Sequence, residues 1–313
     1  MSKICIVMAT YNGERYLQEM LNSLANQTRP ADKIIVVDDG STDSTPEILK
    51  KNQSNLPLQI FLCDTNQGHR AAFAKGLQEA QKETLGDDFI VLADQDDIWL
   101  PGKLEILEKE IGDSSLVYGD AEIIDKNGNF SNSSWRAFSH IDCDGTMKHQ
   151  IAGINNVTGC LSLFRANLLP QILPIPDTVT VHDRWIAMIA LKNAGVKAIP
   201  QVVVQYRIHG NNAVGGAKSV AMSKTLDIQQ KWIELILANR QRLQLNDDEQ
   251  KFAEKLLELS RRRTQRSLVV SFLPWIFANR KFLFLKSNIA KTLARTLFSV
   301  VGLPLAKKYF GKN

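Results

Sequence analysis

Short apolar runs alternate with segments of helical period along the first hundred residues of this chain. The apolar runs cover residues 4–9, 34–37, 58–63 and 89–93, and the helical segments between them cover residues 14–26, 46–52 and 69–82. Runs of this length suit buried strands, and their regular alternation with helices is typical of βαβ units. The pattern therefore predicts an α/β fold with a mostly parallel sheet flanked by helices. Asn12 and Thr45 are the expected N-cap residues of the helices that follow them, and residues 126–129 (Lys-Asn-Gly-Asn) are expected to form a hairpin turn.

Carboxylates follow two of these predicted strands directly. Asp94, Asp96 and Asp97 come after the run 89–93, and Asp38 and Asp39 come after the run 34–37. In an open α/β sheet, ligands bind beyond the carboxyl ends of the strands. Clustered carboxylate oxygens there suit Mg²⁺ or Mn²⁺ carrying a diphosphate. The two strand ends predict a metal-assisted enzyme that acts on a nucleotide.

Two common nucleotide-binding loops are absent from the sequence. Thr10, Tyr11, Asn12 and Gly13 follow the first predicted strand, without a Gly-x-Gly-x-x-Gly pattern, and no Gly-x-x-x-x-Gly-Lys-Ser/Thr loop occurs anywhere. Dinucleotide-dependent and P-loop enzymes are therefore disfavoured. The four cysteines form no Cys-x-x-Cys pair, which favours neither a zinc site nor a disulfide framework and suits a reducing cytosol.

The ordered motifs resemble those of the family 2 inverting glycosyltransferases, which have the GT-A fold. The resemblance rests on residues 9–12 (Ala-Thr-Tyr-Asn), 37–43 (Val-Asp-Asp-Gly-Ser-Thr-Asp), 66–68 (Asn-x-Gly) and 94–97 (Asp-x-Asp-Asp), and it spans residues 3 to about 215. It implies a GT-A catalytic domain, a nucleotide-sugar donor and a bound Mn²⁺ or Mg²⁺.

The resemblance also implies roles for individual residues in donor and metal binding. Thr10, Tyr11 and the pair Asp38 and Asp39 would hold the nucleotide. Arg70 would meet the base or the diphosphate, and Asp94 would lie near the ribose and the metal. Asp96 would ligate the cation, and His209, in a Tyr-Arg-Ile-His segment with Asn212 nearby, would be the second ligand.

Asp183 is the expected general base, because an acceptor hydroxyl needs a carboxylate to take its proton as it attacks the anomeric carbon. The family more often has Glu-Asp at this place, and this chain has His182 and Asp183, which leaves the function of His182 open. The Asp-Gln-Asp-Asp-Ile-Trp, His-Asp-Arg-Trp and Tyr-Arg-x-His segments together resemble rhamnosyltransferases. They favour dTDP-rhamnose as the donor, with UDP-hexose or UDP-N-acetylhexosamine as the alternative.

Each of these residues also has a purely structural interpretation. Asp38 and Asp39 can cap a turn with nearby hydroxyls, and Asp183 can cap a helix. Thr10 can be an ordinary strand-end residue, Tyr11 a core residue, Arg70 an exposed helix residue and His209 a hydrogen-bonded loop residue. For His69 and His140 the structural interpretation is preferred.

The charge distribution predicts a boundary in the chain. Residues 261–313 contain twelve Lys or Arg and no Asp or Glu, whereas residues 1–260 contain 26 basic and 33 acidic residues. Beyond residue 219 the pattern is wholly helical, so we expect a catalytic domain over residues 1–218 and a helical region with a basic amphipathic tail over residues 219–313. Residues 131–150 are polar without period and are expected to form a substrate-shaping loop.

The tail interleaves aromatic and basic residues from residue 268 to residue 309, with breaks at Pro274, Gly302 and Pro304. No segment is long enough to span a bilayer, and the first apolar run is too short for a signal peptide. We therefore expect a cytoplasmic enzyme that lies on an anionic membrane surface, or a tail that packs on the catalytic domain. Nucleic-acid binding is not expected, since no recognised module accompanies the charge.

The expected function is thus inverting sugar transfer to a lipid-linked glycan in bacterial surface polysaccharide synthesis. Two alternatives come from other classes: a metal-dependent phosphohydrolase, which would need a nucleophilic Asp, and a non-catalytic membrane-docking scaffold. The absence of an Asp-x-Asp-x-Thr segment after the first strand argues against the phosphohydrolase. The joint presence of Asp94, Asp96 and Asp183 argues against the scaffold.

Overall fold

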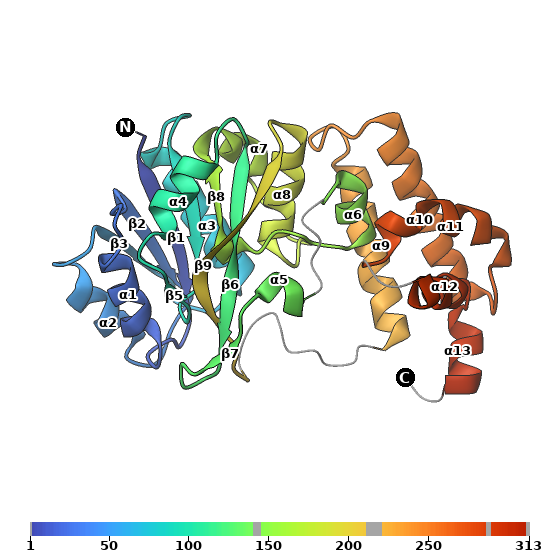
Figure 1. The fold of residues 1–313 in the computed structure, drawn as a ribbon, viewed down its shortest axis with the longest axis horizontal. Helices are drawn as coiled ribbons and strands as arrows, with labels where there is room; N and C mark the ends of the chain where they lie inside the picture. Colours follow the sequence, from blue (N-terminus) through green and yellow to red (C-terminus); the bar gives the residue numbers. More distant parts are fainter. Residues whose placement is uncertain (1, 140–144, 211–220, 286–288, 311–313) are drawn as a thin grey trace. The chain divides into compact units, whose positions relative to one another are not determined.

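The computed structural model of the chain describes residues 2–139, 145–210, 221–285 and 289–310 (Figure 1). The chain forms two compact units, which are described separately. The first, the α/β unit, comprises Met1–Ser139 and Val157–Gly216. The second, the helical unit, comprises His140–Asn156 and Ala217–Asn313.

One mixed sheet organises the α/β unit, with strand order β3-β2-β1-β4-β8-β6-β9-β5 and with β7 paired to β6. The strands are β1 (Ile4–Thr10), β2 (Lys33–Asp38), β3 (Leu58–Leu62), β4 (Phe89–Ala93), β5 (Ile98–Trp99), β6 (Leu116–Ile124), β7 (Phe130–Asn132), β8 (Ser162–Arg165) and β9 (Val196–Arg207). Strands β3, β2, β1 and β4 are all parallel, as is the pair β6 and β9. The expected α/β fold with a helix-flanked sheet is confirmed, and β8, β5 and β7 add antiparallel pairs to it.

The helices of the α/β unit cover both faces of the sheet. Successive side chains of β1 therefore pack against helices on opposite faces. These helices are α1 (Leu17–Ala25), α2 (Thr45–Asn52), α3 (His69–Glu83), α4 (Lys103–Glu110), α5 (Trp135–Phe138), α7 (Leu169–Ile172) and α8 (His182–Lys192), with 3-10 turns at Gly159–Leu161 and Ala166–Leu168. Ile6 packs in the core cluster with Leu21 of α1 and Leu107 of α4. Val7 faces α3, where a Cβ on Gly76 would lie 2.5 Å from its Cγ1. Gly76 therefore lets α3 approach the sheet closely.

Three local expectations are corrected. The described part of residues 131–150 includes most of β7, all of α5 and the start of α6 (Met147–Ala152), so it holds more regular structure than its lack of period indicated. Asn12 does not cap α1, because its Oδ1 accepts from the Thr42 N–H at 2.9 Å and the helix begins after Tyr16. Ser44, and not Thr45, is the N-cap residue of α2.

The expected hairpin at residues 126–129 is confirmed. The Asp125 N–H donates to the Asn129 carbonyl at 2.9 Å, and the Gly128 N–H donates to the Asp125 carbonyl at 3.0 Å. This turn joins β6 to β7.

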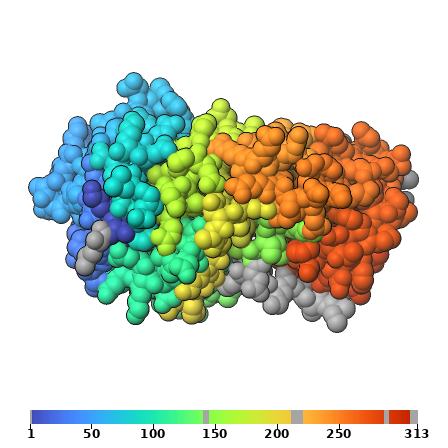
Figure 2. Space-filling model, turned by 90° about the horizontal axis from the view of Figure 1, so that it is seen from above, coloured from blue at the N-terminus to red at the C-terminus, as the bar shows by residue number. Residues whose placement is uncertain are grey.

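The helical unit is built around α9 (Met222–Ala238) and α10 (Asp247–Gln265). Gln230 bonds Thr264, and Glu234 pairs with Arg261, so the two helices run antiparallel. The remaining helices are α6, α11 (Leu273–Leu283), α12 (Ile289–Phe298) and α13 (Leu303–Phe310), with a 3-10 turn at Val270–Phe272. In the space-filling view, α9 to α13 are coloured orange to red (Figure 2). Within the described residues, no helix has both the length and the apolar character that crossing a membrane requires.

The helical C-terminal region that the sequence predicts is present. The predicted division at residue 218 falls outside the described residues, and it stays a prediction. Segment 140–156 joins the helical unit, where the Trp232 indole N–H donates to the Gln150 carbonyl at 2.9 Å. A contact over 82 residues leaves no local trace in the sequence.

Candidate active site

The carboxyl ends of β2, β1 and β4 lie side by side, and they bring together the polar residues that follow these strands. Thr10 pairs in register with Asp38, and its hydroxyl donates to Asp38 Oδ2 at 2.8 Å. The Asp38 carboxylate also accepts from the N–H and the hydroxyl of Ser41, at 2.9 and 2.6 Å. These bonds match the turn-capping interpretation of Asp38, and its expected contact with a nucleotide stays a prediction. We call this region of the α/β unit, at the ends of β1, β2, β4 and β9, the strand-end site.

Asp39 orders the Asn-x-Gly segment of the sequence. Its two carboxylate oxygens accept from the backbone N–H groups of Gln67 and Gly68 at 2.9 and 2.7 Å. Gly68 has φ of 90°, a conformation that glycine adopts without steric cost. The Asp39 carboxylate is buried in this loop, which leads directly into α3.

Gln95 links the loop after β4 to the loop after β1. Its side-chain amide accepts from the Tyr11 N–H at 2.8 Å and donates to the Tyr11 carbonyl at 3.0 Å. The Tyr11 side chain is exposed. Gly13 lies under the amide, since a Cβ there would come within 2.3 Å of Gln95 Oε1. An exposed ring on a doubly fixed backbone suits stacking on a planar ligand.

Asp96 and His209, the two expected metal ligands, lie in contact although 113 residues separate them. His209 Nε2 is 2.8 Å from Asp96 Oδ2, and both side chains keep partial exposure of 13 and 15%. A carboxylate oxygen and an imidazole nitrogen are donors that Mn²⁺ accepts well, and Mg²⁺ uses the carboxylate. The pair therefore fits a divalent cation.

Arg207 holds this pair in place, and the sequence did not identify that function. Its Nε donates to the Asp96 carbonyl at 2.8 Å, and its backbone N–H donates to Asp97 Oδ1 at 3.0 Å. Its Nη2 meets Glu19 Oε2 of α1 at 2.5 Å. The guanidinium also lies over the ring of Tyr16, 4.6 Å from its centroid. A fully buried arginine thus fixes the acidic loop against β9.

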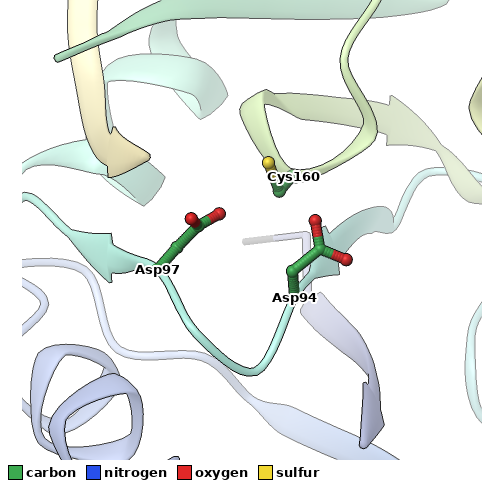
Figure 3. A group of neighbouring side chains, drawn as sticks. All are labelled: Asp94, Asp97 and Cys160. Carbon is green, nitrogen blue, oxygen red and sulfur yellow. The ribbon is translucent and has the colours of Figure 1, made fainter. Parts of the chain in front are cut away.

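A second acidic group lies deeper in the α/β unit. Side-chain atoms of Asp94, Asp97 and Cys160 come within 4.8 Å of one another, and the two carboxylates point toward the loop that carries Cys160 (Figure 3). Burial and the charge of Asp96 raise the pKa of Asp94 to about 7, and the same causes raise the pKa of Asp97 well above its usual value. Burial and the neighbouring carboxylates therefore disfavour the charged forms of Asp94 and Asp97.

Lys103 is buried beside this group. Its ammonium donates to the Cys160 carbonyl at 2.5 Å and lies 3.2 Å from the centroid of the Trp99 ring. Burial lowers the pKa of Lys103 to about 7, although the negative charges of Asp97 and Asp94 act to raise it. When protonated, Lys103 offsets part of the negative charge of Asp97 and Asp94.

Asp183, the expected base, lies in the first turn of α8 and faces the loop before β8. Its Oδ2 accepts from the Gly159 N–H at 3.0 Å. Gly159 leaves the carboxylate room, because a Cβ there would lie 3.2 Å from Asp183 Cβ. The charge of Asp183 also contributes to the raised pKa of Asp94, so the two carboxylates lie within electrostatic reach.

His182 is the residue before the expected base. It is buried, and its ring stacks on Phe73 with centroids 4.0 Å apart. Burial lowers its pKa to about 3, and the nearby His69 adds to the effect. His182 is therefore a neutral packing residue at neutral pH, next in sequence to the expected base.

The remaining expected residues are placed as follows. Arg70 lies in the first turn of α3 and pairs with the exposed Asp177 at 3.2 Å. Asn212 and His140 lie outside the described residues. Sequence reasoning missed Gln95, Arg207, Glu19, Lys103 and Cys160. Of these, Gln95 and Arg207 lie in the sequence motifs described above.

A sequence model of glycosyl transferase family 2 matches residues 5–173, more than half of the chain. Two curated relatives are each 38% identical. One is the uncharacterized glycosyltransferase YwdF of Bacillus subtilis, over 129 residues, which are 40% of this chain and 46% of YwdF. The other is the poly(ribitol-phosphate) beta-N-acetylglucosaminyltransferase TarS of Staphylococcus aureus, over 99 residues, 31% of this chain and 17% of TarS. This chain thus spans less than half the length of either relative.

Solved structures resemble the fold over nearly the whole chain. S. aureus TarS 1-349 in complex with UDP-GlcNAc has a TM-score of 0.61 at 19% identity, with coverage of 95% of this chain and 81% of TarS 1-349. The mannosyltransferase PcManGT of Pyrobaculum calidifontis, in complex with GDP-Man and Mn²⁺, has a TM-score of 0.51 at 17% identity, with coverage of 99 and 88%. At these identities the likeness is one of fold, and the expected GT-A fold is confirmed.

Proposed function

This chain belongs to glycosyl transferase family 2, and we propose that it transfers a sugar from a nucleotide-sugar donor to an acceptor hydroxyl with inversion at the anomeric carbon. One observation carries the proposal. Asp183 accepts from the N–H of Gly159, and the next residue, Cys160, has its side chain within 4.8 Å of that of Asp94, two residues from the Asp96 and His209 pair. This proximity supports a shared site for the proposed base, donor-binding residue and metal ligand. In many active sites, neighbouring carboxylates in different environments have different functions, one in ligand binding and another in proton transfer.

The loops after β1, β2 and β4 would hold the donor nucleotide. Asp39 fixes the loop that enters α3, and Gln95 fixes the backbone beneath Tyr11. We propose that the exposed Tyr11 ring stacks on the base, with Thr10 and Asp38 shaping the pocket floor. Arg70, at the start of α3, would release the exposed Asp177 and pair with the more highly charged diphosphate.

Asp96 and His209 would hold Mn²⁺ or Mg²⁺, which neutralises the charge that grows on the departing diphosphate. Arg207 orients Asp96 through its carbonyl and ties the acidic loop to α1 through Glu19. The side chain of Asp96 is thereby directed at His209 before any ligand binds, and less ordering remains to be done on binding.

Asp183 would take the proton of the acceptor hydroxyl as that oxygen attacks the anomeric carbon. The Gly159 N–H holds one carboxylate oxygen and sets the orientation of the group. Attack opposite the departing diphosphate is a single displacement. The product is therefore expected to have the opposite anomeric configuration to the donor, without a covalent glycosyl-enzyme.

Two donors follow from different observations. The His-Asp-Arg-Trp and Tyr-Arg-x-His segments favour dTDP-rhamnose. The likeness to TarS, whose solved complex contains UDP-GlcNAc, favours a UDP-linked N-acetylhexosamine. We propose the UDP sugar as the first donor to test, because that argument rests on a relative with a named activity. The proposed acceptor is a lipid-linked surface glycan at the inner face of the cell membrane.

A donor screen tests the proposal. The purified chain is incubated with each common nucleotide sugar and Mn²⁺ or Mg²⁺, and release of the nucleoside diphosphate is measured. One donor should stand out, and chelation should stop its turnover. NMR of the product should show the inverted anomer. Metal-independent turnover, or retention of configuration, would reject the proposed mechanism.

A further inference from the structure

The helical unit exposes an unusual share of large hydrophobic side chains. Twelve such residues are exposed in the described part of the chain, and six of them lie within a tenth of its length. These six are Leu268, Val270, Phe277, Leu293, Leu297 and Phe298. An apolar concentration of this kind marks an interaction surface rather than scattered exposure.

Helix α12 carries the centre of this surface. Its leucines are exposed and a threonine is buried, which is the reverse of the pattern in an ordinary surface helix. Leu293 and Leu297 are 47 and 61% exposed, and they share one face with the exposed Ala290 and Ala294. The buried side of the helix holds Thr296, whose hydroxyl donates to the Thr292 carbonyl at 2.8 Å. A helix that packs on a protein core buries its leucines and exposes its threonines.

The backbone extends the apolar surface beyond α12. The Val269 N–H donates to the Val300 carbonyl at 3.0 Å, and Leu268 and Val301 form an antiparallel bridge. The exposed Leu268 and Val270 thereby lie alongside the C-terminal end of α12, where Phe298 is half exposed. Leu268, Val270, Leu293, Leu297 and Phe298 are called the α12 face.

Exposed basic side chains lie on α12 and at the end of α11. Lys291 and Arg295 lie on α12 itself, and Arg280 and Lys281 close α11; all four are exposed. Arg295 donates to the Leu285 carbonyl and Arg280 to the Phe277 carbonyl, at 2.9 and 2.7 Å. Main-chain carbonyls anchor these guanidinium groups without neutralising their charge, and residues 261–313 contain no acidic residue.

We propose that the α12 face docks on an anionic lipid bilayer, with its leucines in the interface and its basic residues at the headgroups. The apolar side chains match the acyl region of the bilayer, and the flanking cations match its anionic headgroups. A second copy of the chain does not fit as the occupant, since a twofold contact would bring the same basic residues face to face. This inference deepens the membrane-bound acceptor of the proposed function, but its test requires no turnover.

Vesicle binding tests the proposal with a matched control. The full chain is mixed with phosphatidylcholine vesicles with and without phosphatidylglycerol, and the pelleted fraction is measured. The double variant Leu293→Glu and Leu297→Glu should partition about tenfold less or weaker still, because it loses apolar insertion and gains repulsion. Leu85→Glu with Phe130→Glu, at residues 79 and 64% exposed in the α/β unit, should bind as the unchanged chain does.

A charge variant provides a second test that does not depend on apolar substitution. Lys291→Gln should weaken binding to phosphatidylglycerol vesicles about fivefold, whereas Lys51→Gln on α2 should not. Equal unfolding midpoints would show that the variants are folded. Equal pelleting of the double variant and the unchanged chain, or no pelleting on anionic vesicles, would overturn the proposal. Failure of the donor screen alone would leave it standing.

Discussion

The strand-end site and the α12 face both concentrate charge, with opposite signs and in opposite surroundings. At the strand-end site, the carboxylates accept hydrogen bonds from backbone N–H groups, including that of Arg207, and several of them are buried. On the α12 face, cations are exposed and the apolar residues beside them are exposed as well. Fixed, partly desolvated charge suits a small ligand in one geometry. Exposed mixed surface suits a broad partner without fixed geometry.

The largest expected effect follows from breaking the cation pair at the strand-end site. Asp96→Asn should lower turnover roughly 10³-fold or more, because charge stabilisation worth several kcal/mol is lost from the transition state. Mn²⁺ affinity, measured by calorimetry, should fall with it. Asp113→Asn, at an exposed loop position, is the control. Full turnover of Asp96→Asn would place the cation elsewhere.

Arg207→Lys should have the next largest effect. Lysine retains the charge but cannot reach the Asp96 carbonyl and Glu19 with a planar fork. Changes to groups that orient metal ligands typically cost roughly 10- to 100-fold in metal affinity. The Mn²⁺ dependence of turnover should therefore shift to higher concentration, while saturating Mn²⁺ restores most of kcat. A loss of kcat that excess Mn²⁺ does not restore would assign Arg207 to folding alone.

His182 predicts an acid sensitivity that is specific to the α/β unit. With a pKa of about 3 in the fold, it takes up its proton less readily than in the unfolded chain, where the pKa is about 6.5. The unfolded state then binds more protons below pH ~6.5, so stability falls as pH falls toward 3. Between pH 7 and pH ~4.5, the free energy of unfolding should fall by about 2 kcal/mol less in His182→Phe than in the unchanged chain. Denaturant unfolding at the two pH values measures it, and parallel losses in both proteins would contradict the assignment.

The smallest expected effect separates the two regions. The double variant Leu293→Glu and Leu297→Glu should transfer sugar to a water-soluble acceptor at the unchanged rate, within about twofold, since exposed substitutions seldom perturb a fold. The same variant should be defective only with an acceptor embedded in anionic vesicles. A general loss of turnover would show that α12 contributes to the catalytic fold.

Local patterns in the sequence predicted the sheet and the strand-end carboxylates, because strand ends and helix starts leave short-range signals. Asp94 and Asp38 follow from such patterns alone. The contact of Asp96 with His209 came from a family resemblance, since it spans 113 residues. The bond between Arg207 and Glu19 spans 188 residues and has no local signal. Asn12 was assigned to the wrong partner because a distant N–H, that of Thr42, competes for its side chain.

Helix α6 shows the same limit for secondary structure. Its six residues are too few to be stable alone, so it forms through contacts with the helical unit. The reversed faces of α12 were also beyond prediction. Its helical period was visible, but which face turns outward depends on packing at Thr296 and Val300.

Asp183→Asn tests the central claim most directly, because it separates donor binding from proton transfer at one carboxylate. Donor affinity is measured by calorimetry and single-turnover transfer by product formation, with Mn²⁺ present in both. The account predicts unchanged donor affinity and a turnover lower by roughly 10² to 10⁴, the range for a lost general base. Normal turnover in this variant would contradict the account, since Asp183 would then only bind Gly159 and stabilise the start of α8.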